Sequence, residues 1–199
     1  MRPTITEDVI TLRSPVLAGM TDDEFFDFCR LNTTVHIERT AEQEILLMSP
    51  AGFESSSVSG EVYFQLSAWN KQSRLGKVGE SSAGYILPDS SVLSPDASWF
   101  SLPQWEQVDK EQRRKFLPLC PELVVEVKSP SDRLKTLQAK MLDWLRNGAQ
   151  LAWLLVPETE TAYLYRPGQP EPEVMQGFDH ELSGEAVLPG FRLRLAELR

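Results

Sequence analysis

Residues 121–130 constrain the fold of this chain more than any other stretch of its sequence. Within them, residues 123–128 read Leu-Val-Val-Glu-Val-Lys, and this density of valine predicts a strand in the interior of a sheet. Residues 132–147 carry apolar side chains at helical spacing, and residues 151–156 form a second apolar run. A strand, a helix and a strand in this order favour a sheet with a helix packed on it.

The rest of the chain also alternates predicted strands and helices. Helical spacing occurs at residues 21–31 and 54–71, and residues 103–116 are polar and helix-prone. Strands are predicted at residues 35–39, 44–49, 77–80, 84–87, 96–100, 161–166 and 191–195. This order predicts an α/β protein in which a mixed central sheet is flanked by helices.

Length and composition indicate one globular domain. The chain has 199 residues, of which 41% are hydrophobic and 25% charged, which excludes a disordered or fibrous protein. It has only two cysteines, Cys29 and Cys120, which excludes a disulfide framework. We divide the predicted domain into an N-terminal helical extension at residues 1–34, a core at 35–166, and a C-terminal acidic segment and strand at 167–199.

Nothing in the sequence points to a membrane or to secretion. No apolar run approaches the roughly 20 residues that a membrane-spanning helix needs. Residues 1–8 contain no apolar stretch of the signal-peptide kind. We therefore expect a cytoplasmic protein with no membrane partner.

The formal net charge of −9 is unevenly distributed along the chain. Residues 157–185 hold seven acidic residues and one basic residue, so −6 belongs to this segment and −3 to the rest. Such acidity argues against a general nucleic-acid binder, but it leaves room for a basic surface elsewhere. A basic cluster, Lys110 with residues 113–115, is either a solvated helix face or a contact for a phosphate backbone.

Two charged residues, Glu126 and Lys128, lie in the valine-rich strand. Alternate residues of a strand share a face, so these two side chains are neighbours, roughly 6.5–7 Å apart along the strand. Burying a carboxylate and an ammonium costs several kcal/mol per ion unless the charges are paired or hold a metal. The alternative is an edge strand with one face in water.

An aspartate, Asp96, begins the predicted strand at residues 96–100, directly after Pro95. Taken alone, this residue reads as a turn aspartate, because Pro-Asp is favoured in turns. Taken with Glu126 and Lys128, it completes the pattern of an aspartate on one strand and Glu-x-Lys on the next. This pattern is that of the PD-(D/E)xK nucleases.

The resemblance extends beyond these three residues. The chain resembles a family of short restriction-endonuclease-like nucleases of the PD-(D/E)xK superfamily, long catalogued as a domain of unknown function. The matching stretches are residues 44–52, 84–88, 94–99, 121–132, Lys140, Trp153 and residues 188–191. Together they span the chain from about residue 35 to the C-terminus.

This resemblance implies a restriction-endonuclease-like core and a divalent-metal site. The expected metal is Mg²⁺, with Mn²⁺ as a possible substitute, held by the carboxylates of Asp96 and Glu126 and by the backbone carbonyl of Val127. Hard cations of this kind take oxygen ligands. Lys128 is then expected to position the nucleophilic water.

The resemblance also implies two further catalytic candidates. Many relatives lack a lysine at the place of Lys128, and a lysine in the following helix, here Lys140, is expected to assist. Its alternative reading is a surface lysine that snorkels along the helix flank. An extra acid is expected at Glu38 or at Glu54. We favour Glu38, because it fits a family position on the first strand of the opening hairpin, whereas Glu54 is alternatively an N-terminal helix acid that only favours the dipole.

The function implied by this resemblance is metal-dependent hydrolysis of phosphodiester bonds in DNA by an endonuclease. A homodimer is expected, since cutting both strands takes two sites. One alternative is a catalytically silent nucleic-acid-binding or regulatory protein that retains the fold. The other is a structural or partner-binding protein in which Glu126 and Lys128 form a salt bridge on a wet sheet face.

Overall fold

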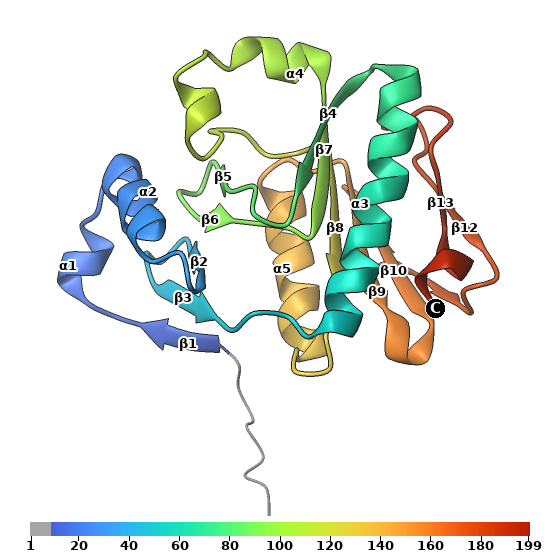
Figure 1. Cartoon of the computed structure of the whole chain (residues 1–199), viewed down its shortest axis with the longest axis horizontal. Coiled ribbons are helices and arrows are strands. Elements are labelled where there is room, and N and C mark those ends of the chain that lie inside the picture. Colours follow the sequence, from blue (N-terminus) through green and yellow to red (C-terminus); the bar gives the residue numbers. More distant parts are fainter. Residues whose placement is uncertain (1–8) are drawn as a thin grey trace, which may run out of the picture.

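Six strands form the central sheet of the structure, a computed structural model that describes residues 9–199 (Figure 1). Their order across the sheet is β11-β10-β9-β8-β7-β4. The strands are β4 (Gly76–Glu80), β7 (Ala97–Ser101), β8 (Leu123–Val127), β9 (Leu151–Val156), β10 (Thr161–Tyr165) and β11 (Glu173–Gln176). Strands β8 and β9 are parallel and all other neighbours are antiparallel, which confirms the predicted mixed sheet.

Two long helices cover opposite faces of this sheet, α3 (Phe53–Ser73) and α5 (Leu134–Arg146) (Figure 1). Every residue of β8 is buried, as its valine content predicts. Its alternate residues face the two helices: Val125 packs in the cluster of α3, and Val124 packs in that of α5. Burial of each such side chain contributes about 1.5–3 kcal/mol, so this central strand anchors both layers.

A second sheet of five short strands lies beside the first, in the order β1-β3-β2-β6-β5. The strands are β1 (Val9–Leu12), β2 (His36–Arg39), β3 (Ile45–Met48), β5 (Tyr85–Ile86) and β6 (Val92–Leu93). Helices α1 (Pro15–Ala18) and α2 (Asp22–Leu31) precede β2 and, with this sheet, enclose a small core around Phe25 and Ile45.

The N-terminal region differs from the predicted helical extension at residues 1–34. It contains strand β1, which pairs with β3 in antiparallel register and so belongs to the second sheet. The apolar residues of β1 are exposed or half-buried at the edge of that sheet, so they show no clear alternation that would predict a strand. Residues 1–8, where we expected no signal peptide, lie outside the described residues.

The C-terminal segment adds strand β11 to the edge of the central sheet, and the rest of it folds back onto the α3 face of that sheet (Figure 1). This later part comprises the hairpin of β12 (Glu181–Ser183) and β13 (Arg192–Arg194), and the 3₁₀ turn η3 (Leu195–Leu198). Phe178, Phe191 and Leu195 bury their side chains in the α3 cluster. The sequence predicted a strand near β13 but missed β11 and β12.

Two predicted helices, at residues 103–116 and 132–147, are shorter in the structure than the sequence indicates. Residues 103–116 form α4 (Leu102–Gln107) and a 3₁₀ turn, η1 (Gln112–Arg114), and a further 3₁₀ turn, η2 (Pro157–Thr159), follows β9. Helix α5 begins two residues later than expected, because Asp132 accepts hydrogen bonds from the backbone and hydroxyl of Ser129 instead of capping the helix. None of the helices in residues 9–199 has both the length and the apolar character that a bilayer span requires.

Candidate active site

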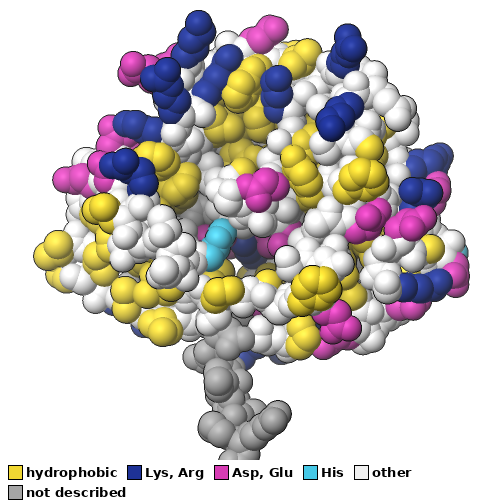
Figure 2. All heavy atoms as spheres, in the orientation of Figure 1, with side chains coloured by type: hydrophobic (Ala, Val, Ile, Leu, Met, Phe, Trp, Pro, Cys, Tyr) yellow, Lys and Arg dark blue, Asp and Glu magenta, His cyan; other side chains and the backbone are white. Residues whose placement is uncertain are grey.

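A cavity of about 550 Å³ opens between the second sheet and the central sheet. Residues from the first turns of α3, from α5 and from the adjoining ends of β7 and β8 line it. Figure 2 shows the hollow near the middle of one face, with acidic side chains and a histidine at its wall. Five carboxylates and one ammonium line it: Glu38, Glu80, Asp96, Glu126, Asp132 and Lys140. The wall is therefore strongly negative, which favours a bound cation.

Asp96 lies where β7 and β8 begin to separate. Ala97 pairs with Val125, so continuing the antiparallel register by one residue places Asp96 opposite Glu126. The carboxylate of Asp96 accepts a hydrogen bond from the backbone N–H of Val127 at 2.7 Å and another from the hydroxyl of Ser59 at 3.1 Å. Burial raises the pKa of Asp96, and these two donors oppose that shift.

Glu126 is a buried carboxylate at the end of β8, with an exposed fraction of 5%. Its Oε1 accepts hydrogen bonds from Lys140 Nζ at 2.9 Å and from Trp144 Nε1 at 3.2 Å. Burial raises the pKa of Glu126 to about 7 despite the Lys140 ammonium, and the neighbouring Asp96 and Glu38 carboxylates contribute to the rise. Since both of these donors reach Oε1, the second oxygen, Oε2, is the one available to the cavity.

Glu38 approaches the same point from strand β2 of the second sheet. Its Oε1 accepts hydrogen bonds from Lys140 Nζ at 2.9 Å and from the backbone N–H of Ser94 at 2.8 Å. Burial alone would raise the pKa of Glu38, but the Lys140 ammonium, with help from His36 and Ser94, lowers it to about 2. Glu38 is therefore ionised at any physiological pH, whereas Glu126 titrates near neutrality.

Lys140 connects the two glutamates. Its Nζ lies 2.9 Å from an oxygen of each and 3.2 Å from the carbonyl oxygen of Ser94, and only 17% of its side chain is exposed. Burial acts to lower the pKa of Lys140, but Glu126 and Glu38 outweigh it and raise the pKa above its ordinary value. Lys140, the assisting lysine implied by the resemblance, thus lies at the strand ends and not on an exposed flank of α5.

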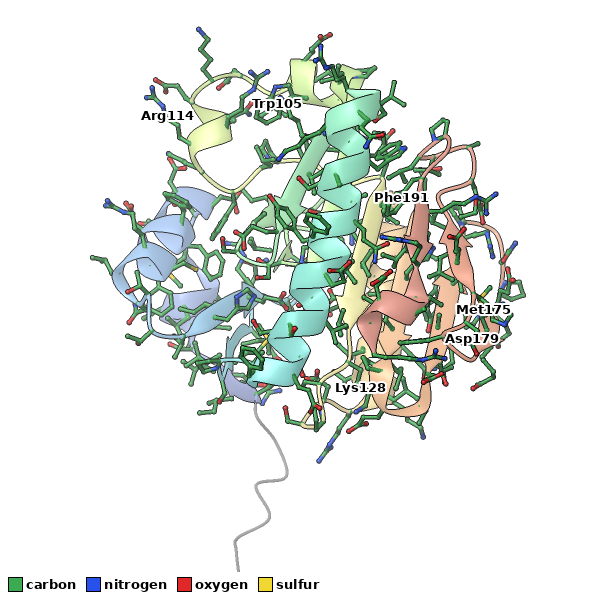
Figure 3. All side chains as sticks on the ribbon, turned by 45° about the vertical axis from the view of Figure 1, so that its right-hand side comes forward. Trp105, Arg114, Lys128, Met175, Asp179 and Phe191 are labelled. Carbon is green, nitrogen blue, oxygen red and sulfur yellow. The ribbon has the colours of Figure 1, made fainter. Side chains whose placement is uncertain are left out.

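Lys128 lies elsewhere. It follows the last residue of β8, and its Nζ donates to the carbonyl oxygen of Ser129 at 2.8 Å and to Glu158 at 3.3 Å. It is not among the residues that line the cavity, and Figure 3 shows it at the lower end of the sheet. The expectation that Lys128 stands beside Glu126 is thus corrected: strand β8 ends at Val127, and the ammonium of Lys128 binds the Ser129 carbonyl and Glu158 instead of reaching the cavity.

Of the predicted positions Val127 and Glu54, only Val127 lines the cavity. Val127 lines the cavity between Glu126 and Ser129, and its backbone N–H donates to Asp96. Glu54, the alternative to Glu38, is exposed in the first turn of α3 and does not line the cavity. Of the two candidate acids, the structure brings only Glu38 to Glu126.

Three residues of the site were missed by sequence reasoning. Trp144 lies on the apolar face of α5 and is fully buried, but its indole N–H also reaches Glu126. Ser59 donates to Asp96 from α3, and the four serines among residues 55–59 were a usable signal, because serine is not favoured inside helices. His36 lines the cavity with its Nε2 3.9 Å from Glu38, and a lone histidine gave no motif to find.

The donor set suits a hard divalent cation. In residues 9–199 no three side chains of His, Cys, Asp or Glu gather into a closed metal cage. Mg²⁺ does not require one, because it usually keeps several waters and binds through one or two carboxylates. Asp96 and Glu126, with the backbone of Val127 beside them, supply oxygen donors of that kind in a cavity whose charge is negative.

The mixed sheet, with two facing carboxylates and a helix-borne lysine at the ends of its central strands, defines a restriction-endonuclease-like protein. The chain belongs to the Uma2 family, described as "putative restriction endonuclease", whose family profile matches residues 22–196. The structure is similar to the crystal structure of a putative nuclease belonging to DUF820 from Anabaena variabilis ATCC 29413. That match has a TM-score of 0.71 at 22% sequence identity and covers 90% of this chain and 97% of the other. No curated protein matches the sequence. These comparisons confirm the family and the fold class predicted from the sequence.

Proposed function

We propose that this protein is a metal-dependent endonuclease that hydrolyses phosphodiester bonds in DNA. The observation that carries the proposal is the meeting of Asp96, Glu126 and Lys140 on the wall of one cavity, from β7, β8 and α5. The chain belongs to a family described by the corresponding activity, which supports the same reaction class.

The metal would be held by Asp96, by Oε2 of Glu126 and by the carbonyl oxygen of Val127. When bound, Mg²⁺ or Mn²⁺ polarises the phosphodiester and lowers the pKa of a coordinated water. With a pKa of about 7, Glu126 is only partly ionised at neutral pH, and its protonated form must release the proton to bind a cation. Ser59 and the Val127 N–H hold the Asp96 carboxylate in place for that purpose.

Lys140 would act as a fixed cation rather than as a base. Its raised pKa keeps the ammonium protonated at neutral pH, so it donates hydrogen bonds and cannot accept a proton. A preorganised ammonium at this point stabilises the negative charge that develops on the phosphate and orients the attacking water. Lys128 is replaced in this role, because its ammonium pairs with Glu158 outside the cavity.

Glu38 would serve as a positioning residue for Lys140. It is ionised and buried, and it contacts the same ammonium that binds Glu126. Without it, the long side chain of Lys140 would be restrained only by Glu126 and the Ser94 carbonyl. This arrangement ties the second sheet, which carries Glu38 on β2, to the catalytic ends of β7 and β8.

A cleavage assay tests the proposal. Supercoiled plasmid and single-stranded DNA are incubated with the protein in Mg²⁺ or Mn²⁺, and the products are separated on a gel. Wild type is expected to cut, while Glu126→Gln and Lys140→Met lose most of the activity and Lys128→Met keeps it as the matched control.

Two outcomes would contradict the proposal. Failure of wild type to cut either substrate with either metal would favour a catalytically silent nucleic-acid-binding protein with the same fold. Equal losses for Lys140→Met and Lys128→Met would contradict the assignment of Lys140.

Cutting of both strands of the plasmid would further require two sites, so we expect a homodimer in the same preparation by light scattering.

A further inference from the structure

A basic surface lies at the end of the molecule formed by the last turn of α3, strand β4, α4 and η1. Residues 70–79 and 102–117 carry seven Lys or Arg residues and three acids, a net charge of +4 in a chain of net charge −9. The two segments are joined through the β4–β7 pairing and a hydrogen bond from Leu102 N to Leu75 O at 2.9 Å. We call this surface the basic end; its cations are Lys71, Arg74, Lys77, Lys110, Arg113 and Arg114.

The cations of the basic end are available to an external anion. In residues 9–199, Lys71, Arg74, Lys110 and Arg114 form no ion pair. Most other cations of the chain are neutralised by carboxylates, for example Arg166 by Glu173 and Glu185, and Arg199 by Glu160 and Asp179. Unpaired cations hold counterions that a polyanion releases on binding.

Trp105 organises two of these cations. The guanidinium of Arg113 lies 4.0 Å from the centre of the Trp105 ring, and the Lys77 ammonium lies 5.5 Å from it. Arg113 also donates a hydrogen bond to the Trp105 carbonyl oxygen at 2.7 Å. Cation–π contacts of this length restrain long side chains before a ligand arrives, which lowers the entropy lost on binding.

The basic end lies on the same face of the molecule as the cavity. Figure 2 shows Lys and Arg side chains gathered along the upper edge of the face on which the cavity opens, and Figure 3 places Trp105 and Arg114 at that end. Helix α3 connects the two places, since Ser59 lines the cavity and Lys71 lies in the last turns of the helix. Twelve residues of α-helix span about 18 Å, the length of about five phosphates along one DNA strand.

We propose that the basic end binds the phosphate backbone of duplex DNA about five base pairs from the phosphate held in the cavity. The proposal rests on the nuclease function argued above and names the surface that positions its substrate. A regularly spaced polyanion fits unpaired cations spread over several segments better than a single anion would. The contacts reach the backbone and not the base edges, so they position the duplex without reading its sequence.

Fluorescence anisotropy of a labelled 20-base-pair duplex tests this surface. Binding is measured over a series of salt concentrations in Ca²⁺, which takes oxygen ligands as Mg²⁺ does, and a gel verifies that the duplex stays intact. Each phosphate contact contributes about 0.9 to the slope of log K against log salt, so Lys110→Gln/Arg114→Gln is expected to lower the slope by about 2. The matched control, Arg192→Gln/Arg194→Gln on β13, removes the same charge elsewhere and is expected to leave the slope unchanged.

Each other outcome has a defined meaning. An unchanged slope for Lys110→Gln/Arg114→Gln, an equal loss in the control, or no binding by wild type would overturn the assignment of the surface. Equal affinity for a poly-glutamate peptide would show a surface for acidic proteins and would also overturn it. If the slope falls as expected but wild type cuts no DNA with Mg²⁺ or Mn²⁺, the surface stands as a DNA contact and the nuclease proposal fails.

Discussion

Replacement of Lys140 by methionine should destabilise the protein far more than the same replacement of Lys128. Lys140 neutralises two buried carboxylates at 2.9 Å each, and the side chains of Glu38 and Glu126 are only 4% and 7% exposed. Methionine keeps the stem but leaves both carboxylates buried without a cation. Removing one partner of a buried ion pair costs about 3–5 kcal/mol, because the remaining charge stays desolvated.

Lys128 provides the matched comparison. Its own side chain is only 12% exposed, but its partner Glu158 has half of its side chain exposed. Water can therefore solvate the Glu158 carboxylate once the lysine is replaced, and the loss of this ion pair should cost about 0–1 kcal/mol. For a domain of this size, 1 kcal/mol shifts Tm by about 2–4 °C, so Lys140→Met should lower Tm by roughly 10 °C and Lys128→Met by no more than a few degrees. Thermal unfolding followed by circular dichroism measures both.

The pH dependence sharpens the test. Because the pKa of Glu126 is about 7 even beside Lys140, this carboxyl group is already protonated at pH 5, so the cost of Lys140→Met should be smaller there than at pH 8. Equal costs for the two lysine variants, or a cost for Lys140→Met that grows as the pH falls, would refute the reasoning.

Three further predictions concern single contacts. Because the pKa of Glu126 is about 7 in the folded protein against an ordinary value of 4.5, the folded form binds more protons in this window. The free energy of unfolding should thus fall by up to about 3 kcal/mol as the pH rises from 4.5 to 7. Urea unfolding measures this fall, and Glu126→Gln should remove it. A fall that is unchanged in Glu126→Gln would refute the raised pKa of Glu126. Trp144→Phe removes the donor to Glu126 Oε1 and should cost about 1–3 kcal/mol beyond any loss of packing. In a Glu126→Leu background, which offers no acceptor, this cost should disappear in a double-mutant cycle, and strict additivity would contradict the contact. Gly76→Ala should lower the free energy of unfolding by about 1–3 kcal/mol, since the new Cβ would lie 2.2 Å from Phe100 O. Gly60→Ala, in open space on α3, should instead raise it by about 0.5–1 kcal/mol. A higher Tm for Gly76→Ala than for Gly60→Ala would contradict the packing of β4 on β7.

The sequence predicted the central layers well because their signals are local. The valine-rich run of β8, the apolar run of β9 and the helical spacing of α5 each report burial through their own periodicity. Strand β1 escaped prediction because its partner β3 lies more than thirty residues away, and pairing of that range leaves no mark in a short window. The same holds for β11, whose residues are largely exposed at the sheet edge.

In the candidate site, too, the sequence predicted what depends on local pairing and missed what depends on tertiary contacts. Asp96 and Glu126 were predicted from neighbouring strands, and the antiparallel register places them opposite each other. The choice between Lys128 and Lys140 could not be settled from the sequence, because a lysine stem reaches several ångströms in any direction. It depends on Glu158, which follows β9 and holds Lys128, and on Glu38 from the second sheet, which holds Lys140. Both partners are brought in by tertiary contacts.

Calorimetric titration with Mn²⁺ tests the central claim most directly, because it asks whether Asp96 and Glu126 bind one cation together. Asp96→Asn keeps the acceptor for the Val127 N–H and a partner for Ser59, so the fold should survive while the charge is removed. The account predicts one Mn²⁺ site per chain in wild type, its loss in Asp96→Asn and in Glu126→Gln, and its retention in Glu158→Gln. Binding that survives both carboxylate variants, or no binding by the wild-type protein, would contradict it.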